Sequence, residues 1–143
     1  MNEIKSIFLP NKEILDNLNS YIQDNIKGTD IPEVWVGRRK IDNKNPMVVF
    51  TETRNEEQSR STTYDNTTRV MSYNVDVFCY KFKNSYDIAI KLATMVCEVM
   101  QGYYKMKGGV IGVIPTFDQN KENPIRINLR FTARFIPSQN KIY

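Results

Sequence analysis

The sequence predicts an α+β fold, a two-layer sandwich in which two helices cover one face of a mostly antiparallel sheet. Two segments repeat apolar residues at spacings of three and four, as amphipathic helices do. Several other segments alternate apolar and polar residues and are separated by turn-forming residues, as strands are. A chain of 143 residues without an internal repeat fits one domain, spanning 1–143.

The first predicted helix covers residues 11–27. Asn11 is placed to cap its start, with Pro10 just outside, and Gly28 is placed to end it. One face of this helix collects the apolar side chains, which are Ile14, Leu15, Leu18, Tyr21, Ile22 and Ile26. We expect that face to pack against the sheet.

Two short strands are predicted next, at 33–38 and 47–52, joined through the turn-forming stretch 42–46 into a hairpin. The following segment, 53–69, has Tyr64 as its only large apolar residue and is predicted to be a long loop between strands. Two interpretations of the loop stay open. It is either a flexible connection or a hairpin arm that becomes ordered against a neighbouring subunit.

A long strand is predicted at 70–81 and a second helix at 86–104, capped by Asn84 or Ser85. The strand buries alternate residues, namely Met71, Tyr73, Val75, Val77 and Cys79. The helix buries a stripe made of Ile88, Leu92, Val96, Val99 and Tyr103. The pair Gly108-Gly109 is expected to break the chain before a strand at 110–117, where Pro115 favours an edge position or a strand end.

The last predicted strand, 124–135, alternates almost without a fault. Its apolar residues are Ile125, Ile127, Leu129, Phe131, Ala133 and Phe135, and three of the residues between them are arginines. Because successive side chains of a strand point to opposite faces, one face is buried and the other carries guanidinium groups. We expect the exposed face of the sheet to carry Asn74, Asp76, Arg126, Asn128, Arg130 and Arg134.

The net charge of +4 lies at the end of the chain. Residues 121–143 hold five basic side chains against Glu122, which leaves +4, whereas the first 120 residues are neutral overall. Such a patch favours an anionic partner, either nucleic acid or an acidic protein surface.

Several kinds of site have no counterpart in the sequence. The chain has no histidine, no Walker loop and no CxxC motif, and the acidic pair Glu56-Glu57 lies in a polar segment that offers little desolvation. Cys79 and Cys97 are interpreted as buried apolar residues rather than a disulfide. We therefore expect no enzymatic activity, no cofactor and no metal. No stretch is apolar enough to span a membrane, and the first residues do not form a signal peptide, which predicts a cytoplasmic protein.

Three interpretations of the arginine-bearing strand remain open. The first is a solvated outer sheet face that binds nothing. The second is a nucleic-acid surface, in which the aromatic residues Trp35, Phe78 and Tyr80 stack on bases beside the arginines. The third is a subunit interface, because the planar guanidinium group of arginine pairs well with carboxylates of a neighbour.

The order of elements, and above all the run from the strand VMSYNVDVFCY to the helix SYDIAIKLATMVCEVM, resembles the tail terminator proteins of long-tailed bacteriophages. These are also called tail completion or head-to-tail joining proteins, and the resemblance covers nearly the whole chain. It implies a structural virion protein of the tail–neck junction, assembled in the host cytoplasm. Such a protein forms a hexameric ring that caps the tail tube, ends its polymerisation and docks to a head connector or head-closure protein. Other phage neck proteins share much of this layout.

The resemblance also implies roles for individual residues. Arg54, Glu56, Glu57, Arg60 and Tyr64 would contact partner subunits from the long loop, and Arg126, Arg130 and Arg134 would lie at a subunit junction or near the channel. Genome DNA passes through that channel without sequence-specific binding, and a bare basic lining would hold it. We therefore expect the arginines to be paired across the ring interface, with Asp76 or the acidic loop residues as partners.

Overall fold

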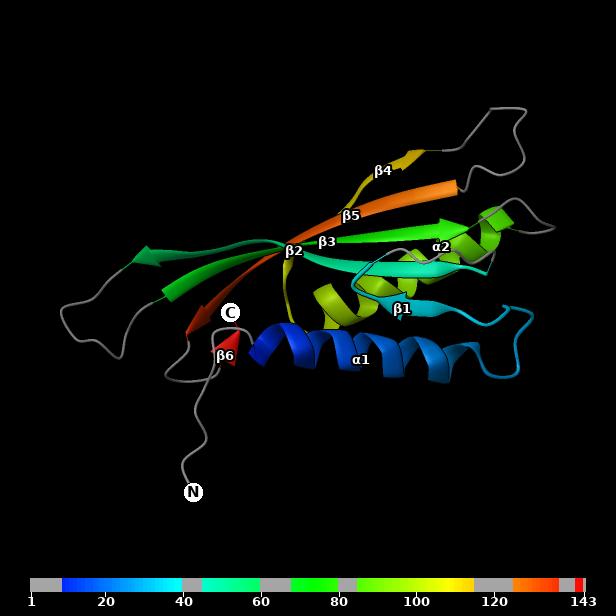
Figure 1. The fold of residues 1–143 in the computed structure, drawn as a ribbon, viewed down its shortest axis with the longest axis horizontal. Helices are drawn as coiled ribbons and strands as arrows, with labels where there is room; N and C mark the ends of the chain where they lie inside the picture. Colours follow the sequence, from blue (N-terminus) through cyan, green and yellow to red (C-terminus); the bar gives the residue numbers. More distant parts are fainter. Residues whose placement is uncertain are drawn as a thin grey trace, which may run out of the picture.

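The computed structural model of the chain describes residues 9–39, 45–59, 68–79, 85–114, 125–136 and 141–142. Two α-helices, one π-helical turn and six strands lie within these ranges (Figure 1). Their order is α1 (Leu9–Ile26), β1 (Trp35–Gly37), β2 (Met47–Ser59), β3 (Thr68–Cys79), α2 (Ser85–Cys97), η2 (Glu98–Tyr103), β4 (Lys107–Ile114), β5 (Ile125–Ile136) and β6 (Lys141–Ile142). The α+β class predicted from the sequence is confirmed.

The strands form one sheet in the spatial order β1-β2-β3-β5-β4, and the two-residue β6 pairs with β5. All neighbours in this order are antiparallel except β1 and β2. The long strands β3 and β5 lie at the centre, and β4 lies at one end of the order. The sequence predicted an edge position or a strand end here because of Pro115. Strand β4 does lie at the edge, and Pro115 itself lies outside the described residues.

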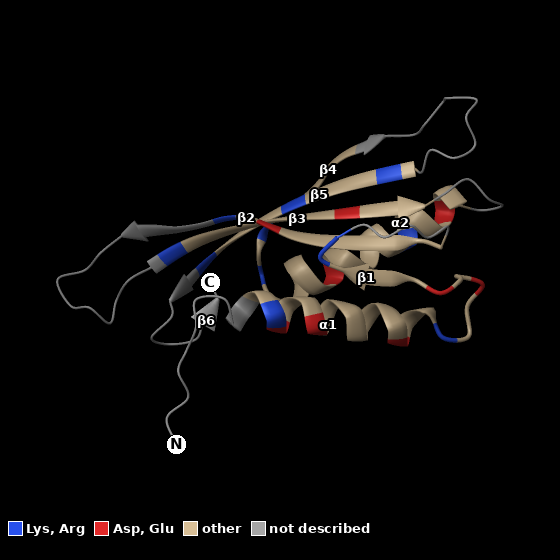
Figure 2. Cartoon of the chain, in the orientation of Figure 1, with Lys and Arg blue, Asp and Glu red and all other residues tan. Residues whose placement is uncertain are grey.

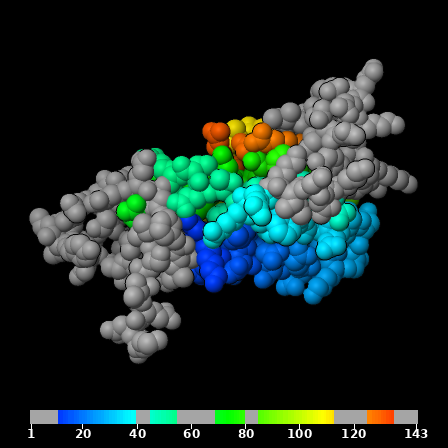
Figure 3. Space-filling model, in the orientation of Figure 1, coloured from blue at the N-terminus to red at the C-terminus, as the bar shows by residue number. Residues whose placement is uncertain are grey.

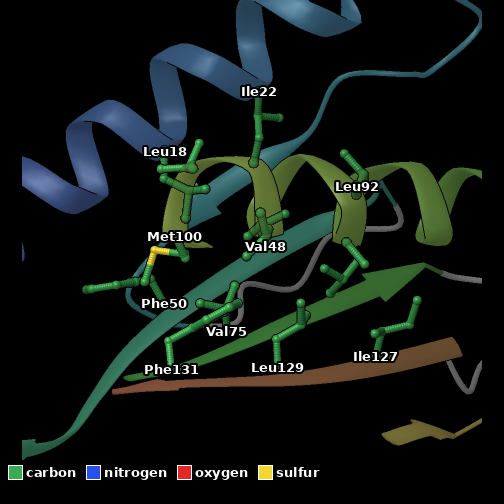
Figure 4. Packing of buried hydrophobic residues seen from close by; sticks show 14 of the residues in the cluster. Leu18, Ile22, Val48, Phe50, Val75, Leu92, Met100, Ile127, Leu129 and Phe131 are labelled. Atoms are coloured by element: carbon green, nitrogen blue, oxygen red, sulfur yellow. The ribbon is translucent and has the colours of Figure 1, made fainter. Parts of the chain in front are cut away.

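The hydrophobic core lies between one face of the sheet and the two helices (Figure 4). Helix α1 contributes Ile14, Leu18 and Ile22, all of which are 0% exposed. The predicted buried face of β3 is confirmed, since Met71, Tyr73, Val75, Val77 and Cys79 are each at most 1% exposed. The strand β5 adds Ile125, Ile127, Leu129, Phe131 and Ala133. Burying this apolar area is the main favourable contribution to folding.

The start of α1 differs from the prediction. The helix begins at Leu9, so Asn11 lies inside its first turn and is buried instead of capping the helix from outside. Its side chain accepts a hydrogen bond of 2.7 Å from the hydroxyl of Tyr73 and donates one to the carboxylate of Glu52. Asn11 therefore ties the helix to β2 and β3. The end of α1 agrees with the prediction, because Gly28 has a φ of 75° two residues after Ile26, the last helical residue.

The predicted hairpin of the first two strands is wrong. Strand β1 pairs parallel to β2, with Trp35 opposite Met47 and Gly37 opposite Val49. The backbone N–H of Trp35 also donates to the carbonyl of Pro46 at 3.0 Å. The nine residues between the strands are enough for the chain to return to the start of β1, which a tight hairpin turn does not allow.

The long loop predicted at 53–69 is also wrong for most of its described part. Strand β2 continues to Ser59 and β3 begins at Thr68, and the two strands pair out to Ser59 and Thr68. Residues 60–67 lie outside the described residues. The prediction failed because 53–59 lacks apolar alternation, yet its backbone still pairs with β3. Figure 1 shows this β2–β3 ribbon projecting past the start of α1.

The second helix changes its geometry before it ends. Residues Glu98–Tyr103 form a π-helical turn, in which the N–H of Tyr104 bonds to the carbonyl of Val99, five residues earlier, at 3.0 Å. The extra residue per turn rotates the following side chains. The predicted buried residue Tyr103 is consequently 70% exposed, while Tyr104 is 8% exposed and accepts a 2.6 Å hydrogen bond from Asn17.

Strand β4 begins earlier than predicted. Gly108 and Gly109 do not break the chain but belong to the strand and pair with Phe131 and Arg130. Gly108 has a φ of 124°, and a Cβ atom there would overlap the backbone carbonyl of Arg130. Only glycine allows both this backbone conformation and this close approach.

We predict that Gly108→Ala destabilises the protein by about 2 kcal/mol or more, because an alanine would be strained in φ and in contact with β5. Gly112→Ala is the matched control on the same strand, since nothing lies within 4 Å of a Cβ at Gly112. Urea unfolding monitored by circular dichroism measures both variants. Equal unfolding midpoints for the two variants would show that the close approach of Gly108 to the backbone of Arg130 does not affect the free energy of unfolding.

Both cysteines are free thiols, as the sequence predicted, but only Cys79 is buried as predicted, because Cys97 is half-buried. Burial raises the pKa of the Cys79 thiol from 9.0 to about 12 and the pKa of the Tyr104 hydroxyl from 10.0 to about 12. The folded state therefore keeps protons that the unfolded chain loses above pH 9 to 10. The resulting stabilisation is complete below pH 9 and is lost as the pH rises toward 12.

We therefore predict that the free energy of unfolding falls steadily between pH 9 and pH 12, measured as urea midpoints. Cys79→Val removes the thiol while keeping an apolar side chain, so its midpoint should fall less over the same interval. At pH 8 the native Cys79 thiol should not react with a thiol reagent. Rapid labelling of Cys79 under native conditions would contradict this prediction.

Candidate functional site

The candidate site is the face of the sheet that points away from the helices, called the outer face below. The register pairs Asp76 with Asn128 and Asn74 with Arg130 across β3 and β5. Because alternate residues of a strand share a face, the polar residues predicted for this face do lie together on it. Strand β2 adds Thr51 opposite Asn74 and Arg54 opposite Ser72.

One part of the outer face is an internal polar network. The carboxylate of Asp76 accepts hydrogen bonds from Arg126 Nε at 3.0 Å and from Asn128 Nδ2 at 2.7 Å. The side chain of Asp76 is 14% exposed, and the guanidinium group of Arg126 lies 5.8 Å from the ring centroid of Phe78. Asp76 is thus already paired within its own chain, which changes the expectation that it pairs with a neighbouring subunit.

The other arginines of β5 are in a different situation. Arg130 and Arg134 are exposed. Among the residues that the structure describes, neither of them has a hydrogen-bond or ion-pair partner. Within the described residues, these two guanidinium groups therefore face solvent.

A shallow depression lies beside Arg130 on the outer face, with a volume of about 450 Å³. Its lining residues come from three neighbouring strands and are Thr53, Arg54, Ser72, Tyr73, Asn74, Arg130, Phe131 and Thr132. The hydroxyls of Ser72 and Thr132 lie 3.2 Å apart across β3 and β5. The depression therefore combines two guanidinium groups with several neutral hydrogen-bonding groups.

Asn74 lies within this depression and has an unusual feature. Its Oδ1 atom is buried from solvent and has no hydrogen-bond donor within the described structure. A buried acceptor without a donor costs about 1–3 kcal/mol, so such atoms are rare in folded proteins. The cost falls on the folded state of the chain itself.

The remaining predicted site residues are placed only in part. The backbone positions of Glu56 and Glu57 lie on β2, opposite Val70 and Arg69, while their side chains are outside the described part. Arg60 and Tyr64 lie outside the described residues altogether. Of the candidate contacts predicted for the loop, Arg54 lines the depression.

The aromatic residues considered for base stacking do not form one surface. Trp35 is 38% exposed on β1 and donates from Nε1 to the carbonyl of Arg39 at 3.1 Å. Phe78 lies on β3 beneath the guanidinium group of Arg126, and Tyr80 lies outside the described residues. Trp35 and Phe78 belong to strands separated by β2.

Sequence reasoning missed Thr53, Ser72 and Thr132 as parts of the site. Alternation along β3 and β5 was enough to place Ser72 and Thr132 on the outer face, but not to place them opposite each other. The sequence could not predict that Asn74 Oδ1 lacks a hydrogen-bond donor. Its neighbours are set by the pairing register of β3 with the adjacent strands, which the sequence does not show.

Two other kinds of feature are missing from the part of the chain that the structure describes. No three histidine, cysteine, aspartate or glutamate side chains gather there as a metal site would require. None of the described helices is both long enough and apolar enough to cross a membrane.

No protein-family model matches the chain, and no curated protein sequence matches it significantly.

We predict that Asn74→Val stabilises the free protein by about 1 kcal/mol, because it removes an unsatisfied buried acceptor and introduces a residue that favours strands. Ser72→Val is the matched control on the same face, where the hydroxyl already has a partner in Thr132. Thermal unfolding measures both variants, and a lower melting temperature for Asn74→Val would contradict the prediction.

Proposed function

We propose that the protein is a structural component of a bacteriophage particle, forming a ring that caps the tail tube and joins it to the head. The observation that carries the proposal is the exposed pair Arg130 and Arg134 on the outer face of the sheet. Arginine is favoured at protein interfaces, because its planar fork pairs with carboxylates and is less strongly hydrated than lysine. The similarity of the element order to tail terminator proteins gives the particular role.

The β2–β3 ribbon supports the same proposal. It extends the two strands beyond the start of α1 (Figure 1). Figure 2 shows basic bands on the projecting parts of β2, β3 and β5. A projecting ribbon of this kind suits contact with a neighbouring subunit or an adjacent ring.

The ion pair between Asp76 and Arg126 affects how strongly such a ring would bind DNA in its channel. Arg126 is neutralised by Asp76 within the chain, which leaves Arg130 and Arg134 as the basic groups of β5 without a described partner. If these two groups lined a channel, they would hold passing DNA through its phosphates. The proposal therefore assigns them to protein contacts, and DNA would pass without specific binding.

A small nucleic-acid-binding module is the second candidate. The exposed arginines beside the stacked pair of Arg126 and Phe78 favour it. It predicts an affinity for DNA or RNA that falls steeply as the salt concentration rises. The ring proposal predicts weak binding that does not distinguish sequences.

We predict that the protein binds the ends of tail tubes and stops their growth. The tail-tube subunit of the phage that encodes this chain would be polymerised with and without the protein, and tube lengths would be measured by negative-stain microscopy. Shorter tubes with one ring of about six subunits at an end support the proposal. Unchanged tube lengths, or binding along the tube wall, would contradict it.

A further inference from the structure

One row of residues runs across four strands at the depression on the outer face. Arg54 on β2 lies opposite Ser72 on β3, which in turn lies opposite Thr132 on β5. Lys107 on β4 continues the row on the far side of Thr132. Figure 3 shows these four strands side by side along the upper surface of the molecule, coloured teal, green, orange and yellow from β2 to β4. The row thus has basic residues at both ends and two hydroxyls between them.

Arg54 belongs to this row because of an irregularity in β2. The carboxylate of Glu52 accepts a hydrogen bond from α1, so Glu52 lies on the helix side of the sheet. Regular alternation would turn Thr53 outward and Arg54 back toward the helices. The pairing shifts between Glu52 and Arg54, however, so that Arg54 lies opposite the outward residue Ser72. A β-bulge re-aims a side chain in this way, and here it brings a second guanidinium group to the depression.

The two hydroxyls in the middle of the row supply a hydrogen-bond donor. Those of Ser72 and Thr132 lie 3.2 Å apart, and either of them can donate to the other. One O–H is used in that bond, and the hydrogen of the accepting hydroxyl has no partner among the described residues. The pair can therefore donate one hydrogen bond to a group that lies over it.

The charge around the hydroxyl pair is positive. Arg54 and Arg130 both line the depression and are both exposed, and none of the lining residues is acidic. The nearby carboxylate of Asp76 is already paired with Arg126. Two guanidinium groups and an O–H donor around one depression form a donor set for an oxyanion, because the planar fork of arginine pairs with phosphate oxygens in a bidentate way.

The two positive charges distinguish between kinds of phosphate. A terminal phosphate group carries about −1.5 to −2 charges at pH 7. Each phosphodiester of a nucleic-acid backbone carries a single negative charge. The depression has a volume of about 450 Å³, which lies within the range of small-molecule sites. A terminal phosphate therefore matches the two guanidinium groups better than a backbone phosphodiester does.

We propose that the depression binds a terminal phosphate group, either as the free ion or as the end of a small phosphorylated molecule. Arg54 and Arg130 bind its oxygens, and the Ser72–Thr132 pair donates one further hydrogen bond. Gly109 lies opposite Arg130 on β4 and has no side chain that would cover the bound group. The site goes beyond the proposed function and does not depend on it, because binding can be measured on the free subunit.

An NMR titration of the isotope-labelled protein tests the site, with the ionic strength held constant by sodium chloride. The probes are inorganic phosphate, methyl phosphate and dimethyl phosphate, of which the last is a phosphodiester. The first should shift the Nε–H signals of Arg54 and Arg130 and reach saturation. Dimethyl phosphate should bind at least about tenfold more weakly, because it has one charge fewer and two oxygens fewer to accept hydrogen bonds. Methyl phosphate binding as tightly as inorganic phosphate assigns the site to phosphorylated molecules, and binding of inorganic phosphate alone assigns it to the free ion.

Substitutions test the individual groups. Arg54→Gln and Arg130→Gln should each weaken phosphate binding by at least about tenfold, since each removes charged hydrogen bonds. Arg130→Lys keeps the charge but loses the planar fork, so its affinity should lie between those of the wild type and Arg130→Gln. Arg134→Gln is the matched control, because Arg134 is exposed on the same strand and face but does not line the depression. It should leave phosphate binding unchanged.

Four outcomes would overturn the inference. They are shifts that do not saturate by about 100 mM phosphate, dimethyl phosphate binding as tightly as methyl phosphate, normal binding by both Arg→Gln variants of the depression, or an equal loss in Arg134→Gln. Failure of the proposed function is distinguishable from these outcomes. A protein that binds phosphate here but leaves tube lengths unchanged keeps the site and loses the function, and one that caps tubes without binding phosphate does the reverse.

Discussion

The antiparallel pairing of β3 with β5 is the constraint on which the rest of the structure depends. The two central strands pair without interruption from Arg69 and Phe135 to Cys79 and Ile125. This register sets the apolar residues of both strands on one face, where α1 and α2 cover them. A shift of one residue would turn the apolar side chains of one strand toward solvent, so the core permits only this register.

The same register determines which polar residues are neighbours on the outer face. Because inner and outer residues alternate, the pairing that aligns Val75 with Leu129 also aligns Asn74 with Arg130 and Asp76 with Asn128. One of these outer pairs is satisfied internally through Asp76 and Arg126, and the other is left with an unpaired donor group and an unpaired acceptor among the described residues. The polar site is thus a direct consequence of how the core is packed.

Local irregularities adjust the elements around this central pair. The π-helical turn at Glu98–Tyr103 rotates the end of the second helix so that Tyr104 reaches α1. Gly108 lets β4 approach the backbone of β5 more closely than any other residue would permit. Asn11 holds the start of α1 to β2 and β3 through Glu52 and Tyr73. Gly108 and Asn11 thus connect β4 and α1 to the strands that bear the site, whereas the π-helical turn connects the end of the second helix to α1.

The class of fold, both helices, the buried face of β3 and the alternating character of β5 could all be predicted from the sequence. They depend on the spacing of apolar residues, which local geometry converts directly into faces. Strand pairing was predicted wrongly where the apolar residues show no regular spacing. Residues 53–59 contain no apolar alternation, so their pairing with β3 could not be seen. The parallel direction of β1 relative to β2 depends on how the chain between the two strands runs, and the residues of β1 themselves do not determine it.

By itself, the sequence determined that one side of the last long strand would be apolar and the other basic, because alternation along a strand is a local property. Only the tertiary structure decided which of those arginines are paired within the described part of the chain and which are not. In the tertiary structure Asp76 forms an ion pair with Arg126. The side chain of Asn74, whose Oδ1 has no donor among the described residues, lies opposite Arg130. The reason is physical: cross-strand register is set by cooperative packing of the whole core, and no residue's neighbours along the chain contain that information.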